Sequence, residues 1–127
     1  MDNLISFAKV LEHAQLSERL LHLRATLHAA QVHAPKQLAS PLLARASAVL
    51  LADIYRLISR EPGARTLPRL DRLQPPEHRH LTGMLRDAQL ALDLFRQAHS
   101  DDEGDNEWRT IEGEEMQAEH RAAMARS

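Results

Sequence analysis

The apolar residues between positions 81 and 95 constrain the fold of this chain more than any other feature. Seven of them recur at intervals of three or four residues: Leu81, Met84, Leu85, Ala88, Ala91, Leu92 and Phe95. At 3.6 residues per turn this spacing places all seven on one face of a helix, and such a face has to be buried against other protein. With Pro75 and Pro76 leading into it, the segment predicts a helix over about 76–99.

The composition agrees with a single helical domain. The 127 residues are enough for one core, and the apolar fraction of 43% is mainly leucine and alanine, with aromatic residues at only 3%. The most apolar stretch, 41–58, contains Arg45, Asp53 and Arg56, so no segment is expected to cross a bilayer. The first residues do not form a basic and apolar leader and the chain has no cysteine, which together predict a cytoplasmic protein.

Charge is divided unevenly along the chain. Residues 1–100 contain 13 Lys and Arg against 9 Asp and Glu, a balance of +4, whereas residues 101–127 contain 3 against 9, a balance of −6. We therefore expect a mildly basic helical domain over 1–100 and an acidic tail over 101–127. Good helix formers over 108–126 make the tail a possible further helix, although its apolar face is weak.

The first predicted helix, over about 3–33, has two apolar faces. One comprises Leu4, Phe7, Ala8, Leu11 and Ala14. The other comprises Leu16, Leu20, Leu23, Leu27 and Ala30, which at 100° per residue lie nearly opposite the first set. Either the helix breaks near Ser17, or one long helix, capped by Asp2 or Asn3, is covered on both sides. The second alternative needs more protein than a single three-helix chain supplies, and it predicts a homodimer with Leu16, Leu20, Leu23 and Leu27 as the seam.

The middle of the chain contains a clear helix start. This start is Ser40 followed by Pro41, because serine caps the first turn of a helix and proline is favoured at its first position. The predicted central helix covers about 40–60. Beyond it, Leu67, Leu70 and Leu73 recur every third residue between prolines, which predicts a short helical turn laid over the core. The whole pattern predicts an all-α antiparallel bundle of three to four main helices.

Asp53 is the most unusual residue of the predicted core. It lies on the apolar face of the central helix, where an ionised carboxylate is costly without a partner. We expect an ion pair with an arginine of another helix, and the candidates are Arg24, Arg86 and Arg96. The alternative is a recessed acid in a pocket, beside Tyr55 or a histidine.

Two other features are candidate binding surfaces. The arginine-rich segment 60–80 has as its main cations Arg65, Arg69, Arg72 and Arg79. Arginine contacts phosphate through two nitrogens at once, so such a segment attracts nucleic acid. Glu61, Asp71 and Glu77 dilute its charge, however, and a solvated arginine face is the interpretation we favour. Trp108 is a lone tryptophan in a polar tail, which predicts packing on its own domain, on a second copy or on a partner.

No motif of an enzyme or cofactor site is recognisable. The eight histidines include no pair three or four residues apart, the glycines are scattered, and no serine has a glycine-flanked elbow. We therefore expect no cofactor and no metal. The favoured function is a non-enzymatic interaction protein, such as an adaptor, a chaperone-like protein or an accessory regulator, that acts through an apolar helix face or the acidic tail. A nucleic-acid-associated regulator comes second, and an enzyme with a dispersed site of histidines and Asp53 comes third.

Overall fold

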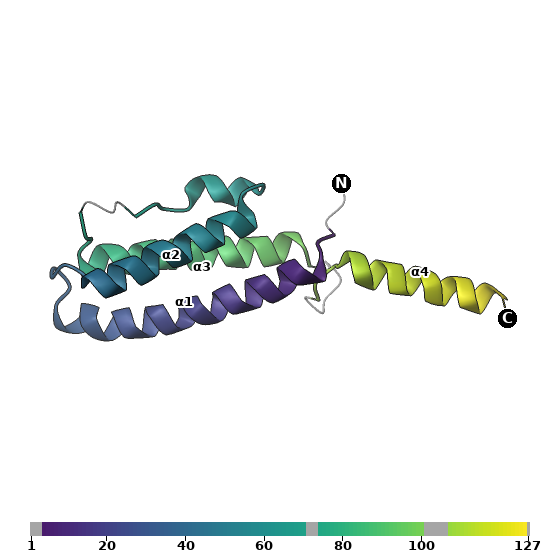
Figure 1. The fold of residues 1–127 in the computed structure, drawn as a ribbon, viewed down its shortest axis with the longest axis horizontal. Coiled ribbons are helices and arrows are strands. Elements are labelled where there is room, and N and C mark those ends of the chain that lie inside the picture. The colour runs from purple at the N-terminus through teal and green to yellow at the C-terminus, as the bar shows by residue number, and fades with distance from the viewer. Residues whose placement is uncertain (1–3, 71–73, 101–106, 127) are drawn as a thin grey trace.

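The computed structural model describes residues 4–70, 74–100 and 107–126, and these residues form a helical bundle with one projecting helix (Figure 1). The elements in chain order are α1 (Phe7–His33), α2 (Pro41–Ile58), the 3-10 helix η1 (Pro62–Thr66), α3 (His78–Ala98) and α4 (Ile111–Arg126). The predicted all-α bundle is confirmed. None of the described helices has the length and apolar character needed to span a membrane.

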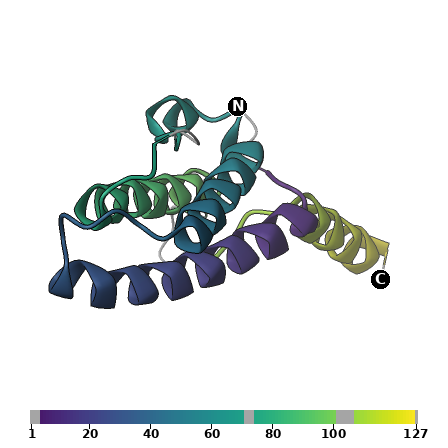
Figure 2. The same cartoon turned by 60° about the vertical axis from the view of Figure 1, so that its left-hand side comes forward.

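The helices α1, α2 and α3 pack together, and α1 runs antiparallel to the other two (Figure 2). α2 and α3 run parallel to each other, which differs from the antiparallel arrangement predicted for neighbouring helices. Two contacts show this, since one joins the starts of the two helices and the other joins their ends. Before the two helices, the Ala39 amide donates to the Pro76 carbonyl at 2.8 Å; after them, the side chains of His99 and Glu61 meet at 2.8 Å. The connection 59–77 therefore returns along α2 instead of turning tightly.

The core lies where these three helices face one another. Its completely buried side chains include Leu20, Leu27, Leu50, Ile54, Ile58, Leu81, Leu85 and Leu92. All seven residues of the 81–95 pattern contribute, with Met84 only partly buried. Full burial of one such leucine or isoleucine stabilises the fold by about 1.5–3 kcal/mol before entropy is counted, so this cluster is the main source of stability.

The helix starts follow local capping. The Ser40 hydroxyl accepts from the Leu43 amide at 3.1 Å, which confirms the predicted cap of α2. α1 begins at Phe7 and not near residue 3, because the Ser6 hydroxyl accepts from the Lys9 amide and caps it there. The helix continues through Ser17, so the predicted alternative of a break at that position is wrong.

The connection between α2 and α3 partly covers the core. η1 occupies 62–66, Ala64 and Leu67 are buried, and Leu70 packs against the core. The helical turn precedes the leucine triplet that predicted it, and Leu73 lies outside the described residues. The loop between α1 and α2 is fixed to the start of α3, since the His78 ring donates from Nδ1 to the Ala34 carbonyl at 2.8 Å.

Candidate functional site

The four leucines of the predicted seam belong to the core of a single chain. Leu16, Leu20 and Leu27 are buried beneath α2 and α3, and Leu23 is partly buried beside them. Their assignment as a dimer seam is therefore wrong, because side chains already covered by their own domain have no area left for a second copy. Both faces are apolar in sequence, so spacing alone does not show which one the domain covers.

The outer face of α1 carries Phe7, Leu11 and Ala14 of the other predicted set, and the same spacing continues beyond them through two polar positions, Glu18 and His28. Its positions follow an alternating four-and-three spacing along the whole helix: Phe7, Leu11, Ala14, Glu18, Leu21, Ala25, His28 and Val32, which we call the outer stripe. All eight are exposed, with Phe7 at 52%, Leu11 at 50%, Leu21 at 67% and Val32 at 62%. The predicted long helix with two apolar faces is thus present, and one of its faces is uncovered in the single chain.

Trp108 packs on its own domain. Its indole lies beside three groups at one end of the bundle: the His13 ring at 4.9 Å between centroids, the Phe95 ring at 6.0 Å and the Arg96 guanidinium at 5.5 Å. The sequence predicts that this side chain packs on its own domain, on a second copy or on a partner, and in the structure it packs on its own domain. Aromatic contacts of this geometry are worth about 0.5–1.5 kcal/mol beyond area burial, so Trp108 anchors the entry to α4.

His13 occupies the position on α1 where the leucine pattern would otherwise continue. The imidazole is 6% exposed, stacks on Phe95 and donates from Nε2 to the Leu92 carbonyl at 2.9 Å. Because a carbonyl only accepts, the neutral ring carries its proton on Nε2, and Nδ1 accepts from the Ser17 hydroxyl at 3.4 Å. Burial lowers the pKa of His13, and the nearby Arg96 charge acts in the same direction.

Backbone bonds join the start of α1 to the start of α4. The Ile5 amide donates to the Arg109 carbonyl at 3.2 Å, and the Ile111 amide donates to the Ile5 carbonyl at 2.9 Å. The Glu112 carboxylate accepts from the Phe7 amide at 2.9 Å, so an acid of α4 satisfies a free donor of α1. The base of α4 is consequently fixed to the bundle at several points.

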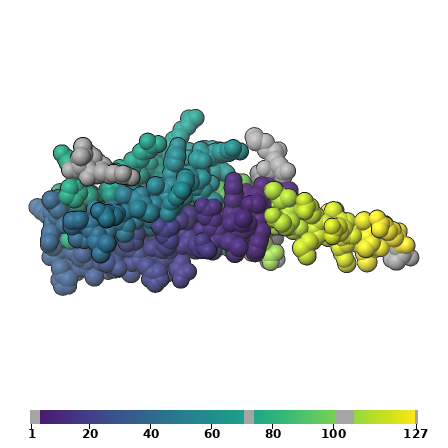
Figure 3. Space-filling view, in the orientation of Figure 1, coloured from purple at the N-terminus to yellow at the C-terminus, as the bar shows by residue number. Residues whose placement is uncertain are grey.

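Beyond its base, α4 extends away from the bundle (Figure 3). It has no buried residue, and Met116 and Met124 are 69% and 65% exposed. The Thr110 hydroxyl accepts from the Gly113 amide at 3.0 Å and caps its first turn. The predicted tail helix is present, and within 111–126 it does not lie on the arginine-rich segment.

The arginines predicted as one basic patch are separated in the structure. Arg65 and Arg69 line the same pocket, whereas Arg79 lies at the start of α3 and pairs with Glu77 at 3.0 Å. Glu77 also contacts His80, and its pKa is lowered, first by the hydrogen bond from Arg79. Arg72 lies outside the described residues. The described part of segment 60–80 therefore does not form one continuous cationic track.

The pocket that holds Arg65 and Arg69 lies between the end of α2 and η1. It has a volume of about 900 Å³, and the polar side chains that line it are Tyr55, Ser59, Arg60, Glu61, Arg65 and Arg69; we call it the arginine groove. The Arg69 guanidinium lies 5.3 Å from the centre of the Tyr55 ring. Glu61 accepts from the His99 ring, which is itself 4.8 Å from the Phe95 ring. Spacing along the chain missed this arrangement, because Tyr55 and Glu61 join the arginines only through the fold.

Asp53 forms the interhelical ion pair that the sequence predicts, with a different arginine. Its Oδ2 accepts from Arg19 of α1 at 2.8 Å, and its Oδ1 contacts Arg56 one turn along α2. The side chain is 17% exposed, so it lies at the edge of the core and not within it. The sequence does not show which face of α1 packs on α2. That packing places Arg19, and none of the three predicted arginines, beside Asp53.

The surroundings of Asp53 do not resemble an acid–base site. The cavity beside it, about 300 Å³, is lined by Glu12, Gln15, Leu16, Arg19, Asp53 and Arg56, with no histidine among them. Two guanidinium groups already occupy the carboxylate. Elsewhere in the described ranges, no three His, Asp or Glu side chains gather closely enough to hold a metal ion. The arginine groove, at about 900 Å³, is a larger polar concavity than the one beside Asp53.

Comparison with known proteins adds no relative. No family model, no curated protein sequence and no solved structure matches this chain.

Proposed function

We propose that this chain is a small non-enzymatic interaction protein whose partner covers the outer stripe of α1, and that this partner is a second copy of the chain. The observation that carries the proposal is the stripe itself. Its four-and-three spacing is the repeat by which two helices pack along their length. Over 27 residues the helix is about 40 Å long, which gives a long contact for a narrow face.

The stripe is suited to pairing with itself in the antiparallel direction. A two-fold axis between Glu18 and Leu21 brings Phe7 opposite Val32 of the partner subunit and Ala14 opposite Ala25 of the partner subunit. Large side chains then meet at the two ends, and the alanines meet on either side of the axis, where they let the helices approach closely. At the axis itself, Glu18 lies opposite Leu21 of the partner subunit. Glu18 and His28 are polar positions within the stripe, so they favour a reversible association over a very stable one.

α4 is the second surface of this proposal. An isolated helix of 16 residues is only marginally stable in water, and most helices gain their stability from packing. α4 carries exposed methionines, which suit adaptable contacts with another protein. Amide hydrogen exchange of the dimer distinguishes two roles: fast exchange through α4 leaves this helix open to a further partner, and protection places it in the dimer contact.

Light scattering of the full chain over a concentration series tests the proposal. We expect the mass to rise from monomer to dimer with concentration, and Leu21→Glu, which puts a charge in the stripe, to abolish that rise. Leu42→Glu is the matched control, because Leu42 is 79% exposed on α2 and outside the stripe. Circular dichroism should show both variants folded. A wild-type mass that stays monomeric throughout, or a rise that Leu21→Glu leaves unchanged, contradicts the proposal.

A further inference from the structure

The arginine groove is an unusually uncompensated cluster of positive charge. Arg60, Arg65 and Arg69 all line it, and none of them has an ion-pair partner within the part of the chain that the structure describes. Glu61 is the acid among the lining residues, and its Oε1 is taken up by the His99 ring at 2.8 Å. Three like charges around one concavity repel one another, and an anion bound among them removes that repulsion.

The fold holds the backbone of Arg65 and the guanidinium of Arg69. Arg65 belongs to η1 and stands between Ala64 and Leu67, which are both buried. Arg69 lies over the Tyr55 ring at 5.3 Å, a cation–π contact that orients its plane. A ligand that meets groups already held in place loses less conformational entropy on binding than one that must order them.

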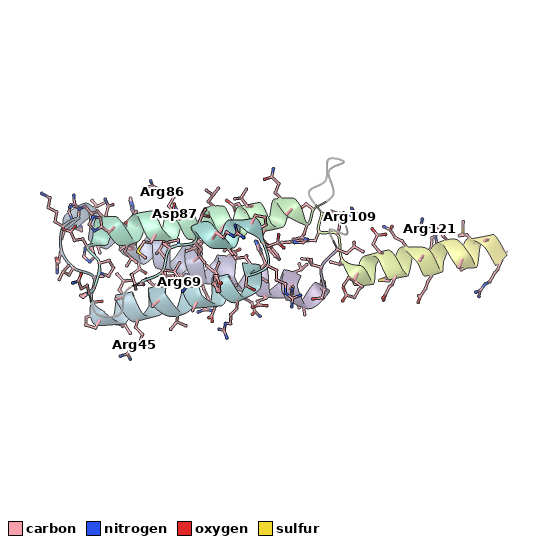
Figure 4. All side chains as sticks on the ribbon, turned by 90° about the horizontal axis from the view of Figure 1, so that it is seen from above. Arg45, Arg69, Arg86, Asp87, Arg109 and Arg121 are labelled. Carbon is pink, nitrogen blue, oxygen red and sulfur yellow. The ribbon has the colours of Figure 1, made fainter. Side chains whose placement is uncertain are left out.

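The size of the groove indicates the size of the ligand. A volume of about 900 Å³ lies at the upper end of the range of small-molecule sites, so it has room for a nucleotide as well as for a free pyrophosphate group. A nucleic-acid backbone needs cations spread along a track, but Arg79 is paired with Glu77, and Arg56 contacts Asp53. Figure 4 shows Arg45 and Arg86 at opposite edges of the bundle, each apart from Arg69. The concentration of guanidinium groups at one concavity fits a compact anion.

We propose that the arginine groove binds a compact phosphate-bearing anion, a pyrophosphate group that is either free or attached to a nucleoside, through Arg60, Arg65 and Arg69. Guanidinium groups match phosphate because each can donate two parallel hydrogen bonds to two phosphate oxygens. Tyr55 lines the same space, and its hydroxyl is a further donor. Ser59 also lines it, but its hydroxyl donates to the Arg56 carbonyl at 3.5 Å. This site is separate from the outer stripe, so it can fail or hold independently of the dimer.

Isothermal titration calorimetry of the full chain with inorganic pyrophosphate tests the proposal. We expect saturable binding that weakens as salt is raised, and a roughly tenfold loss of affinity in each of Arg60→Ala, Arg65→Ala and Arg69→Ala. Arg69→Lys, which keeps the charge without the paired donors, should lie between wild type and Arg69→Ala. Arg45→Ala and Arg86→Ala are matched controls, since both remove an exposed arginine outside the groove, and they should bind as wild type does.

Three results would overturn the proposal: absence of binding at millimolar pyrophosphate, equal losses in the groove and control variants, or full binding in a variant that combines Arg60→Ala, Arg65→Ala and Arg69→Ala. A comparison of the affinities for ADP and pyrophosphate identifies the source of the phosphate. ADP should bind more tightly if the natural ligand is a nucleotide, and no more tightly if it is free pyrophosphate. A duplex oligonucleotide that binds more tightly than either and depends on Arg79 also contradicts the proposal, in favour of a nucleic-acid surface.

Discussion

The ring of His13 meets the indole of Trp108 edge-on, with 4.9 Å between the ring centroids and 71° between the planes. This contact connects the core-facing side of α1 with the segment that enters α4. Because His13 also bonds to the Leu92 carbonyl of α3, one imidazole joins three parts of the chain. We therefore expect protonation of His13 to weaken the contacts that attach α4 to the bundle.

Acid should weaken the attachment of Trp108. Burial lowers the pKa of His13 in the folded protein below its ordinary value of about 6.5, so below that value the unfolded chain binds more protons than the folded one. The contribution of neutral His13 to the free energy of unfolding is complete above pH 6.5, and it is lost as the pH falls from there toward the lowered pKa of the folded protein. Trp108 is the only tryptophan, and its fluorescence during thermal unfolding at pH 7.5 and pH 5.5 reports the change.

His13→Gln is the variant that isolates this effect. Glutamine can still donate to the Leu92 carbonyl but does not titrate, so part of the drop in melting temperature between pH 7.5 and pH 5.5 should disappear. His28→Gln, at an exposed site on the same helix, is the control and should keep the whole drop. Equal pH dependence in His13→Gln and wild type would exclude His13 as the cause.

Removal of the Trp108 ring should detach α4 and leave the bundle folded. Trp108 is partly buried, so Trp108→Ala should cost about 1–3 kcal/mol, less than truncation of a fully buried tryptophan. Amide exchange should accelerate over 111–126 and stay slow in α3. Met116→Ala is the control within α4, since that side chain is exposed. Uniform loss of protection in all helices would show instead that Trp108 supports the entire fold.

The ion pair between Arg19 and Asp53 should contribute little. Arg19 is 45% exposed, and solvent screens a pair of this kind, so a double-mutant cycle of Arg19→Ala and Asp53→Asn should give a coupling below about 1 kcal/mol. Chemical denaturation at low and high salt measures it, and the coupling should shrink at high salt. A value of several kcal/mol would mean that Asp53 is a buried charge that depends on this partner.

The buried hydroxyl of Ser47 should be dispensable. It is fully buried in α2, and its hydroxyl donates to the Leu43 carbonyl one turn earlier at 2.8 Å, a bond that competes with regular helix bonding. Ser47→Ala removes the donor without leaving another group unpaired, and alanine favours helix, so stability should change by less than about 0.5 kcal/mol or rise. Ser47→Leu should destabilise by about 1–3 kcal/mol through overpacking. Denaturant midpoints separate the two variants.

The sequence predicts the helices of this fold better than their arrangement. The 81–95 pattern and the Ser40-Pro41 start depend on neighbours along the chain, so local physics is sufficient for them. Spacing also predicts that Asp53 needs an arginine, but the choice of Arg19 depends on which side of α1 packs on α2. The core face of α1 continues from Leu16 toward the N-terminus through His13. Because His13 is polar, the apolar pattern in the sequence does not show this continuation.

The candidate site was the least predictable part. Arg65 and Arg69 come together in the arginine groove because η1 turns the chain back over α2, whereas Arg79 is carried to the other end of that connection. A run of like charges in sequence does not indicate how the chain will distribute them in space. In sequence, Glu61 reduces the net positive charge of the segment, but in the fold its carboxylate accepts a hydrogen bond from the His99 ring.

The parallel course of α2 and α3 has a consequence for how the chain reaches this shape. A bundle of hairpins can assemble from neighbours in sequence, but here the bond from His13 to the Leu92 carbonyl joins residues 79 positions apart. The end of α3 can pack only after such distant contacts form. Their formation closes a long loop of chain, and local helix formation does not compensate for the entropy lost in that closure. This protein is therefore expected to fold more slowly than an up-and-down bundle of the same length, with the docking of α3 as its slow step.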